Sequence, residues 1–260
     1  MRLSLFVFGL VCFAAAPVGA ADVEYWEAWT AGGNALRPAS ASSQWRGNFG
    51  VGVGLAPDYP GSRDYELVGL PMVDIEWRDT VFFGTQRGLG AHFFTTRQFR
   101  AGARLTYDRG RDNGANERLR TLPNIEASVE AGVFAEYYRK AWRFTADARK
   151  GMTDGHEGVI LSGSAAVGGR ISERASLIVG ANLHVADSDY MDAYFGVGSI
   201  SAKSGLRDVG FFMHVIYSLT DRVYITVDPR ITLLQGDASK STLTNDDVQY
   251  FLGTLIGYRF

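Results

Sequence analysis

The residues Asp247–Phe260 read DVQYFLGTLIGYRF, and their side chains alternate between two kinds. One parity is mostly polar or small, with Gln249, Gly253, Gly257 and Arg259. The other parity is almost wholly apolar and consists of Val248, Tyr250, Leu252, Thr254, Ile256, Tyr258 and Phe260. A repeat of two residues is typical of a β-strand whose two faces meet different surroundings. The stretch therefore predicts a strand with Phe260 on its apolar face.

The same alternation recurs in longer windows elsewhere in the chain. It covers residues 124–137, 159–171, 176–185 and 208–219. Strands of soluble proteins usually have about 5 to 6 residues, whereas a tilted strand that crosses a bilayer needs about 9 to 11. No run of 18 apolar residues is present, so the sequence predicts membrane-spanning strands and no membrane-spanning helix.

Composition narrows the class of protein further. The chain has 260 residues, a formal net charge of -2 and 31 glycines. So small a net charge argues against an electrostatic nucleic-acid binder, and no nucleic-acid partner is expected. The only cysteine, Cys12, lies in an apolar N-terminal run, so no disulfide is expected in the exported protein.

The N-terminal region predicts export. Residues 1–20 begin with Arg2, continue with an apolar run and end in Val-Gly-Ala, as secretory signal peptides do. We expect residues 21–45 to form an N-terminal periplasmic extension and residues 46–260 to form the membrane domain. An exported chain of this length without disulfides is typical of the Gram-negative envelope.

The connections between the alternating windows predict a barrel. Short turns alternate with long polar segments, as in outer-membrane barrels, whose periplasmic turns are short and whose external loops are long. The fold expected is all-β, an antiparallel transmembrane β-barrel of about 12 strands with both termini in the periplasm. The strands are expected at 46–56, 65–77, 80–86, 88–95, 99–108, 123–138, 141–150, 158–171, 174–187, 206–219, 222–235 and 248–260.

Alternatives to this fold remain at this stage. Residues 80–95 could form one long strand, which gives eleven strands and would require a further strand at 23–31; a ten-stranded barrel is also considered. A soluble β-sandwich is less compatible with the sequence, because its strands are shorter and its long loops do not all lie on one side. The barrel predicts localisation in the outer membrane of a Gram-negative cell, in contact with outer-membrane lipid.

Tyr258 and Phe260 are candidate assembly residues. They resemble the terminal aromatic signal of bacterial outer-membrane barrels, which the barrel insertion machinery reads. Their apolar parity also places them in the aromatic girdle at the inner interface.

Charged residues predict the content of the lumen. If Arg139-Lys140 is a tight turn, antiparallel partners sum to 279, so Glu136 faces Arg143 and Glu130 faces Arg149 on the inward side. These residues are expected to form structural pairs in a largely filled lumen. A charged constriction for small solutes is the alternative.

No catalytic, cofactor or metal site is expected. An outer-membrane lipid hydrolase would need a histidine placed beside a nucleophilic serine, and none of the four histidines occurs in a His-x-Ser motif. His184 and His214 are interpreted as lumenal residues and His156 as a loop residue. The segment Asp108–Arg118 could bind a polyanion, but a solvated external loop is the preferred interpretation.

Several motifs together resemble a known family. They are GVGLAPDYPGSRDYELVGLPMVDIEW from Gly52, RLTYDRGRD from Arg104, YFGV from Tyr194, SGLRDVG from Ser204, GDA from Gly236 and FLGTLIGYRF from Phe251. In this order they are similar to the MipA/OmpV family of outer-membrane proteins, the MltA-interacting protein-like barrels, over residues 46–260.

The resemblance implies a non-enzymatic role. The family's namesake is a scaffold that binds a murein-degrading lytic transglycosylase and links it to a bifunctional penicillin-binding protein, the murein synthase. Other members are regarded as surface antigens, adhesins or exporters. The resemblance supplies no catalytic residues, and Ala21–Gln44 is long enough to reach a periplasmic partner.

Overall fold

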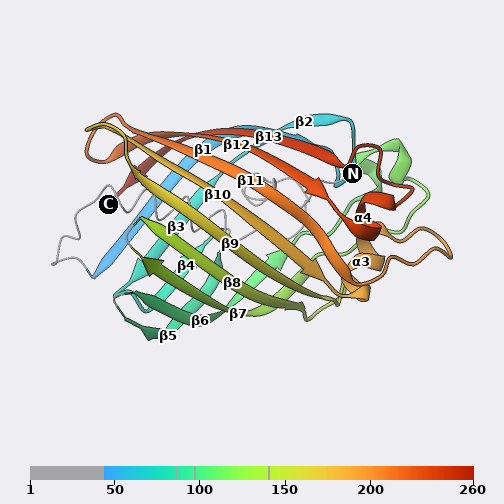
Figure 1. Ribbon diagram of the computed structural model, residues 1–260. Helices are drawn as coiled ribbons and strands as arrows, with labels where there is room; N and C mark the ends of the chain where they lie inside the picture. Colours follow the sequence, from blue (N-terminus) through green and yellow to red (C-terminus); the bar gives the residue numbers. More distant parts are fainter. Residues whose placement is uncertain (1–43, 86, 97, 140) are drawn as a thin grey trace.

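The computed structural model describes residues 44–260 except 86, 97 and 140 (Figure 1). The expected signal peptide lies outside the described residues, as does nearly all of the N-terminal extension. The strands in chain order are β1 (Trp45–Pro57), β2 (Tyr65–Gly69), β3 (Met72–Trp77), β4 (Val81–Gly84), β5 (Gly88–Thr95), β6 (Phe99–Asp108), β7 (Ser128–Arg139), β8 (Trp142–Gly151), β9 (Val159–Arg170), β10 (Ala175–Ala186), β11 (Gly205–Ser218), β12 (Val223–Leu234) and β13 (Val248–Arg259). All their pairings are antiparallel.

The sheet closes on itself through β1 and β13. The closing register runs from Asn48 opposite Arg259 to Leu55 opposite Leu252. β2 and β3 both pair with β1 and count as one interrupted wall strand, so the described part is a twelve-stranded barrel. Pro71 lies at the interruption, and its missing N–H cannot join a ladder. Among the described residues β2 pairs with β1 alone, whereas β3 also pairs with β4.

The predicted antiparallel β-barrel of about 12 strands is therefore confirmed, with two corrections to the strand positions. Residues 80–95 form a hairpin, because β4 and β5 pair with each other, so the reading as one long strand and the ten-stranded alternative are wrong. The strand expected at 123–138 begins only at Ser128. Ile125 instead forms an isolated bridge with Arg111, and the preceding residues belong to the loop.

The outer face of the barrel is apolar. Large exposed side chains on this face include Leu67 at 73%, Phe93 at 77% and Val133 at 61% exposure. In β13, burial changes with every residue, so the polar parity is inside and the apolar parity is outside. Only a hydrocarbon environment favours such an arrangement, and it is that of a transmembrane barrel.

Aromatic side chains mark both edges of this apolar band. At the end with short turns, Trp142 stacks on Phe144 with ring centroids 6.0 Å apart, and Trp45 lies 6.2 Å from Trp77. At the other end, the outward residues Tyr65, Tyr107 and Tyr250 are all exposed. Aromatic girdles of this kind lie at the two membrane interfaces of barrels. No helix of the described residues is long and apolar enough to cross a membrane.

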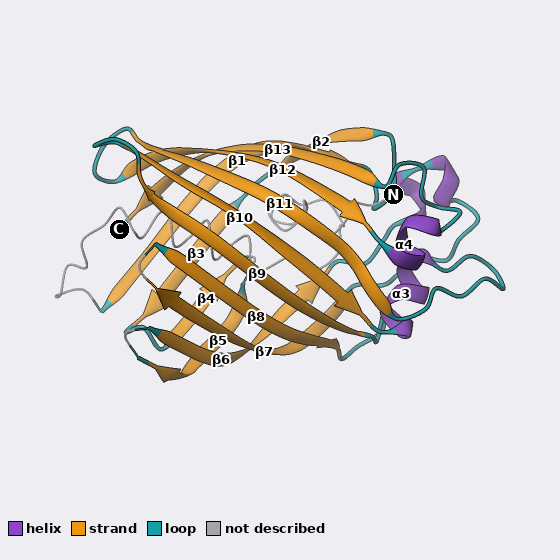
Figure 2. Cartoon of the chain, viewed as in Figure 1, coloured by secondary structure: helices purple, strands orange, loops and turns teal. Residues whose placement is uncertain are grey.

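Short helices gather at the end with long loops (Figure 2). They are η2 (Asn113–Ala115), η3 (Glu117–Leu119), α3 (Ser188–Phe195) and α4 (Gly236–Lys240). Asp187 caps α3 by accepting from the N–H of Tyr190 at 3.0 Å, and its other oxygen accepts from Val159 N at 2.8 Å. This double contact fixes the helix to the first residue of β9.

α3 packs onto the inner side of the barrel end and forms what we call the loop-end core. Its members are Ile125, Ile160, Ala186, Tyr190, Met191, Tyr194, Phe195, Ala202, Leu234 and Ala238. Tyr190 and Met191 are fully buried. The long-loop end is therefore a folded layer that positions side chains over the lumen.

Candidate functional site

The lumen between β6, β7 and β8 holds a continuous network of buried charges. The Arg149 Nε lies 2.8 Å from the Asp147 Oδ1, and its Nη1 lies 3.2 Å from the Glu130 Oε2. Arg104 pairs with the other oxygen of Asp147. All four side chains are at most 2% exposed. Buried charges are costly unless they are paired and hydrogen-bonded, so each of these groups depends on its neighbours.

The four residues expected to form lumen pairs lie together in the lumen. Glu136 and Arg143 form a buried ion pair, and Glu130 pairs with Arg149 at 3.2 Å. The Tyr138 hydroxyl also donates to the Glu136 Oε2 at 2.7 Å.

The expected register between β7 and β8 is wrong by two residues. Arg139 lies opposite Trp142, and Glu136 therefore lies opposite Thr145 rather than Arg143. A shift of two keeps every side chain on its face. The pairs are consequently diagonal, and long side chains bridge the extra distance.

Two further groups of charges line the same lumen. Near the β4–β5 hairpin, the Arg87 Nε lies 2.6 Å from the Asp74 Oδ1 and its Nη2 lies 3.1 Å from the Glu76 Oε2. Across the barrel, the His184 Nδ1 lies 2.7 Å from the Asp208 Oδ1, and Arg207 pairs with the same carboxylate. Charges of both signs are therefore cross-linked on opposite walls.

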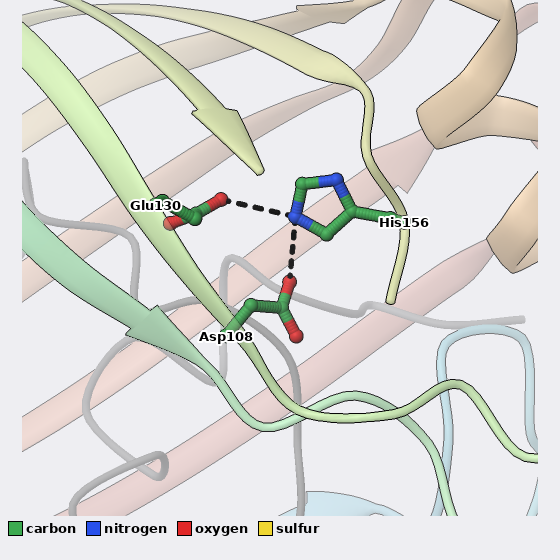
Figure 3. Close-up of side chains that lie close together, drawn as sticks. All are labelled: Asp108, Glu130 and His156. Carbon is green, nitrogen blue, oxygen red and sulfur yellow. Dashed lines mark hydrogen bonds and ion pairs between the residues drawn. The ribbon is translucent and has the colours of Figure 1, made fainter. Parts of the chain in front are cut away.

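Asp108, Glu130 and His156 form a buried cluster where this network meets the loop-end core (Figure 3). The His156 Nε2 lies 3.2 Å from the Glu130 Oε1 and 3.5 Å from the Asp108 Oδ2. All three side chains are 0% exposed. The residues come from the end of β6, from β7 and from the loop between β8 and β9, so the cluster ties three segments together.

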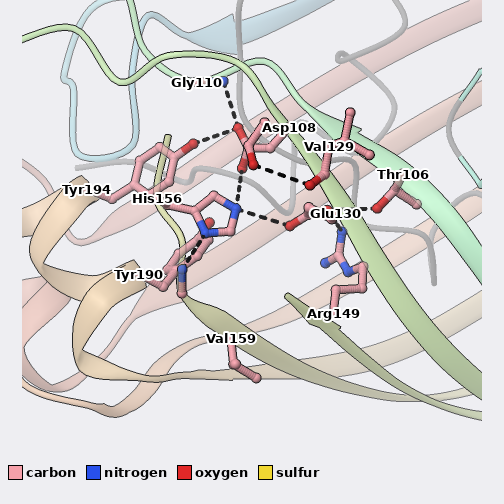
Figure 4. A network of polar contacts seen from close by, with 12 residues as sticks. Thr106, Asp108, Gly110, Val129, Glu130, Arg149, His156, Val159, Tyr190 and Tyr194 are labelled. Atoms are coloured by element: carbon pink, nitrogen blue, oxygen red, sulfur yellow. Dashed lines mark hydrogen bonds and ion pairs between the residues drawn. The ribbon is translucent and has the colours of Figure 1, made fainter. Parts of the chain in front are cut away.

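Neighbouring groups orient the cluster (Figure 4). The Asp108 Oδ1 accepts from the Tyr194 hydroxyl at 2.7 Å and from Gly110 N at 2.7 Å. Gly110 has a φ of 68°, which glycine adopts without strain. The Thr106 hydroxyl donates to the Glu130 Oε2 at 2.8 Å. α3 is thereby joined through Tyr194 to the lumenal charges.

Electrostatics hold Tyr194 protonated. Burial raises the pKa of Tyr194 well above its ordinary value, and the charge of Asp108 raises it further. The phenol therefore remains a donor to Asp108. At His156, burial lowers the pKa, but the bond to Glu130 and the charges of Asp108 and Glu130 outweigh it, so the pKa is raised.

The proton on His156 can be placed from its surroundings. Gly158 N donates to the His156 Nδ1 at 3.1 Å, so Nδ1 is an acceptor and the ring proton of the neutral form lies on Nε2. His156 is then a donor directed at both carboxylates. A second proton on Nδ1 would require residues 156–158 to shift.

This arrangement does not fit a metal ion, although the ligand types would suit one. A divalent cation would need the lone pair of Nε2, which moves the ring proton to Nδ1, against the N–H of Gly158. Ligating histidines almost always donate from the other nitrogen, whereas here the His156 Nδ1 accepts from Gly158 N. The cluster is therefore a hydrogen-bonded junction.

His156 lies in the loop between β8 and β9, as the sequence predicts. The sequence does not predict that its side chain is buried beside the lumenal charges. The sequence predicts a solvated loop at Asp108–Arg118, yet Asp108 and Arg111 are buried at 0% and 5% exposure. The sequence signal for this burial is that Thr106 and Asp108 continue the alternation of inward-facing residues along β6. Tyr258 remains outward at 40% exposure, and the Phe260 ring stacks on Phe49 at 5.3 Å across the closing seam.

Comparisons with solved structures find other barrels. The NanC porin is 10% identical with a TM-score of 0.49, covering 81% of this chain and 98% of that chain. An outer-membrane channel from Pseudomonas putida F1 is 9% identical with a TM-score of 0.45, covering 86% and 99%. The KdgM porin is 6% identical with a TM-score of 0.44, covering 82% and 99%. Such values imply nothing about what this chain binds or conducts.

Family comparison is more specific. Among curated proteins, none matches the sequence. The family described as MltA-interacting protein MipA matches residues 49–260, which is nearly the whole barrel from β1 to the last residue. The match covers far more than half of the chain. This outer-membrane β-barrel therefore belongs to the MipA family.

Proposed function

We propose that the protein is a non-enzymatic scaffold of the outer membrane that binds murein-remodelling enzymes. Its partners would be a lytic transglycosylase, as the name of the family suggests, and a bifunctional murein synthase. In this proposal both ends of the chain and the short turns face the periplasm, where murein lies. Passage of a small solute and surface adhesion are the competing functions.

The cross-linked lumen is the observation that carries this proposal. Buried arginines and carboxylates from β6, β7 and β8 pair across the interior. The loop-end core lies over the same region, and Tyr194 connects the two. A solute would have to break several buried ion pairs to pass, which favours a structural barrel over a pore.

The short-turn end offers a surface for an acidic partner. Exposed arginines gather in the turns and strand ends there, namely Arg78, Arg139, Arg170, Arg174 and Arg222. Glu173 and Asp221 are the exposed acidic residues in the turns between β9 and β10 and between β11 and β12. The excess of positive charge would steer a negatively charged protein surface toward this end.

Affinity capture from solubilised envelope tests this role. The tagged barrel should retain murein hydrolases and synthases, identified by mass spectrometry, and Arg139→Glu with Arg174→Glu should reduce their yield several-fold. Arg118→Glu with Lys203→Glu makes the same charge change on exposed residues of the long-loop segments and should leave the yield unchanged. Equal yields from both double variants would reject the arginine surface as the binding site, and no murein enzyme with the wild type would reject the scaffold.

Tyr258 and Phe260 are proposed as the assembly signal for the insertion machinery. Phe260 also closes the seam, because its N–H and carbonyl pair with Gly47. Deleting Phe260 should reduce the heat-modifiable barrel in the outer membrane more than Asp247→Ala does. Equal amounts of assembled barrel in the two variants would refute the signal.

A further inference from the structure

A groove of about 760 Å³ crosses the outer face of the barrel from β4 to β9. Its floor is made of small outward residues, Ala91, Ala103, Ala131 and Ala148, and Val81 lies at its β4 end. The lining is almost entirely apolar. Most of the outer face carries large side chains, so this concavity is a local feature.

The strand register places the alanines in neighbouring rows. Ala91 lies opposite Ala103, Ala131 lies opposite Lys150, and Ala148 lies opposite Val133. Across β6–β7, Ala103 lies opposite Val133 and Ala131 lies opposite Leu105, so beyond Ala91 and Ala103 the short side chains are staggered between larger ones. Leu89, Leu105 and Val133 on the same strands also line the groove and border the alanines.

The length of the groove suits an extended hydrocarbon chain. From β4 to β9 it crosses five strand spacings of about 4.8 Å, or about 24 Å. Strands in such barrels tilt by about 35–45°, so a path perpendicular to them is oblique to the membrane normal. The groove thus rises from Val81, beside a short turn, toward the long loops at Lys150.

Lys150 lies at the upper end of this apolar path. It is exposed, is the penultimate residue of β8 and shares the outward parity of Ala148. It makes no hydrogen bond or ion pair through its side chain with any residue that the structure describes. A cation on the lipid face is tolerated near an interface, where an anionic headgroup can neutralise it.

We propose that this groove binds one lipid A-type glycolipid, with an acyl chain over the alanines and a phosphate on Lys150. The combination of an apolar path and one terminal cation matches the two ends of such a lipid. The choice of lipid A over a phospholipid rests on the proposed orientation, in which the long loops face the cell exterior and the lipopolysaccharide leaflet.

Native mass spectrometry of the detergent-purified barrel tests the proposal, with lipid A or phosphatidylglycerol as the added lipid. The wild type should bind one lipid A. Lys150→Gln should raise its dissociation constant about tenfold or more, which corresponds to one lost charge-assisted hydrogen bond. Ala103→Leu with Ala148→Leu should abolish binding by filling the floor.

Matched variants separate the groove from general lipid contact. Ala165→Leu and Ala181→Leu change two outward alanines that face each other on β9 and β10 and do not line the groove. They should bind lipid A as the wild type does. Gel mobility before and after heating checks that every variant remains a folded barrel.

Three results would overturn the proposal: no retained lipid A, equal binding by the groove and control variants, or equal affinity for phosphatidylglycerol. Capture of murein enzymes should be unchanged in all groove variants. If the wild type retained no lipid A but still captured murein enzymes, the groove would be rejected and the scaffold would stand.

Discussion

Strands β7 and β8 show two faces that are stabilised in different ways. Toward the lumen, Glu130 and Arg149 are buried ions with specific partners. Toward the lipid, Val133, Trp142 and Phe144 are exposed apolar side chains. Ions need one another at defined positions, whereas hydrocarbon accepts any apolar side chain. Substitutions in the lumen should therefore reduce stability strongly, by an amount that depends on the partner residue. Substitutions on the lipid face should reduce stability less, by an amount that depends on depth in the membrane.

Charge reversal in the lumen should have the largest effect. Glu136→Arg or Arg143→Glu places like charges together in the interior, and each should lower the free energy of unfolding by more than about 3 kcal/mol. The double variant should recover most of this loss. Urea denaturation in detergent measures the free energy of unfolding of all three variants. Simple additivity of the single effects would contradict the diagonal pair.

Removal of Glu130 should have the next largest effect. Glu130→Ala takes a partner from Arg149, His156 and Thr106 at once, and should cost about 3 kcal/mol. Glu173→Ala, at an exposed turn, should stay within about 0.5 kcal/mol. Similar costs for the two variants would show that the cluster does not stabilise the barrel.

On the lipid face, the cost of introducing a charge should depend on depth in the membrane rather than on partner residues. Val133 lies in the middle of β7, so Val133→Lys should cost about 2 to 4 kcal/mol. Phe144→Lys places the same charge near the short-turn girdle, where about 0 to 1 kcal/mol is expected beyond the lost stacking on Trp142. Equal costs would contradict the assignment of the membrane edges.

Much of this contrast could be predicted from the sequence. The alternation predicts the strands because each residue of the barrel wall faces either the lipid or the lumen. A register error of two residues leaves every side chain on the same face, so the inward and outward assignments remain correct. The register itself failed, since moving a two-residue turn by one position shifts all partners by two. Turn placement depends on local backbone geometry, which residues 139–142 do not specify by any Gly or Pro.

The Asp108–Glu130–His156 cluster could not be predicted. Its members lie on three separate segments, with Glu130 and His156 26 residues apart. No local spacing marks them, and their meeting depends on how α3 and the β8–β9 loop fold inward. The family, by contrast, could be recognised from motifs in the correct order.

Metal ions should have the smallest effect on stability. Because Gly158 N donates to the His156 Nδ1, we expect neither excess zinc nor EDTA to change the unfolding temperature of the purified barrel. A zinc-dependent rise that His156→Gln removes would show that the loop rearranges to form a metal site.

The closed lumen is tested most directly by single-channel recording of the wild-type barrel in a planar bilayer. The paired charges and the loop-end core predict no steady porin-like conductance, and opening steps only after Glu136→Arg or Glu130→Ala disrupts the network. Stable open-pore conductance of the unmodified protein would contradict the filled lumen and favour solute passage over the scaffold.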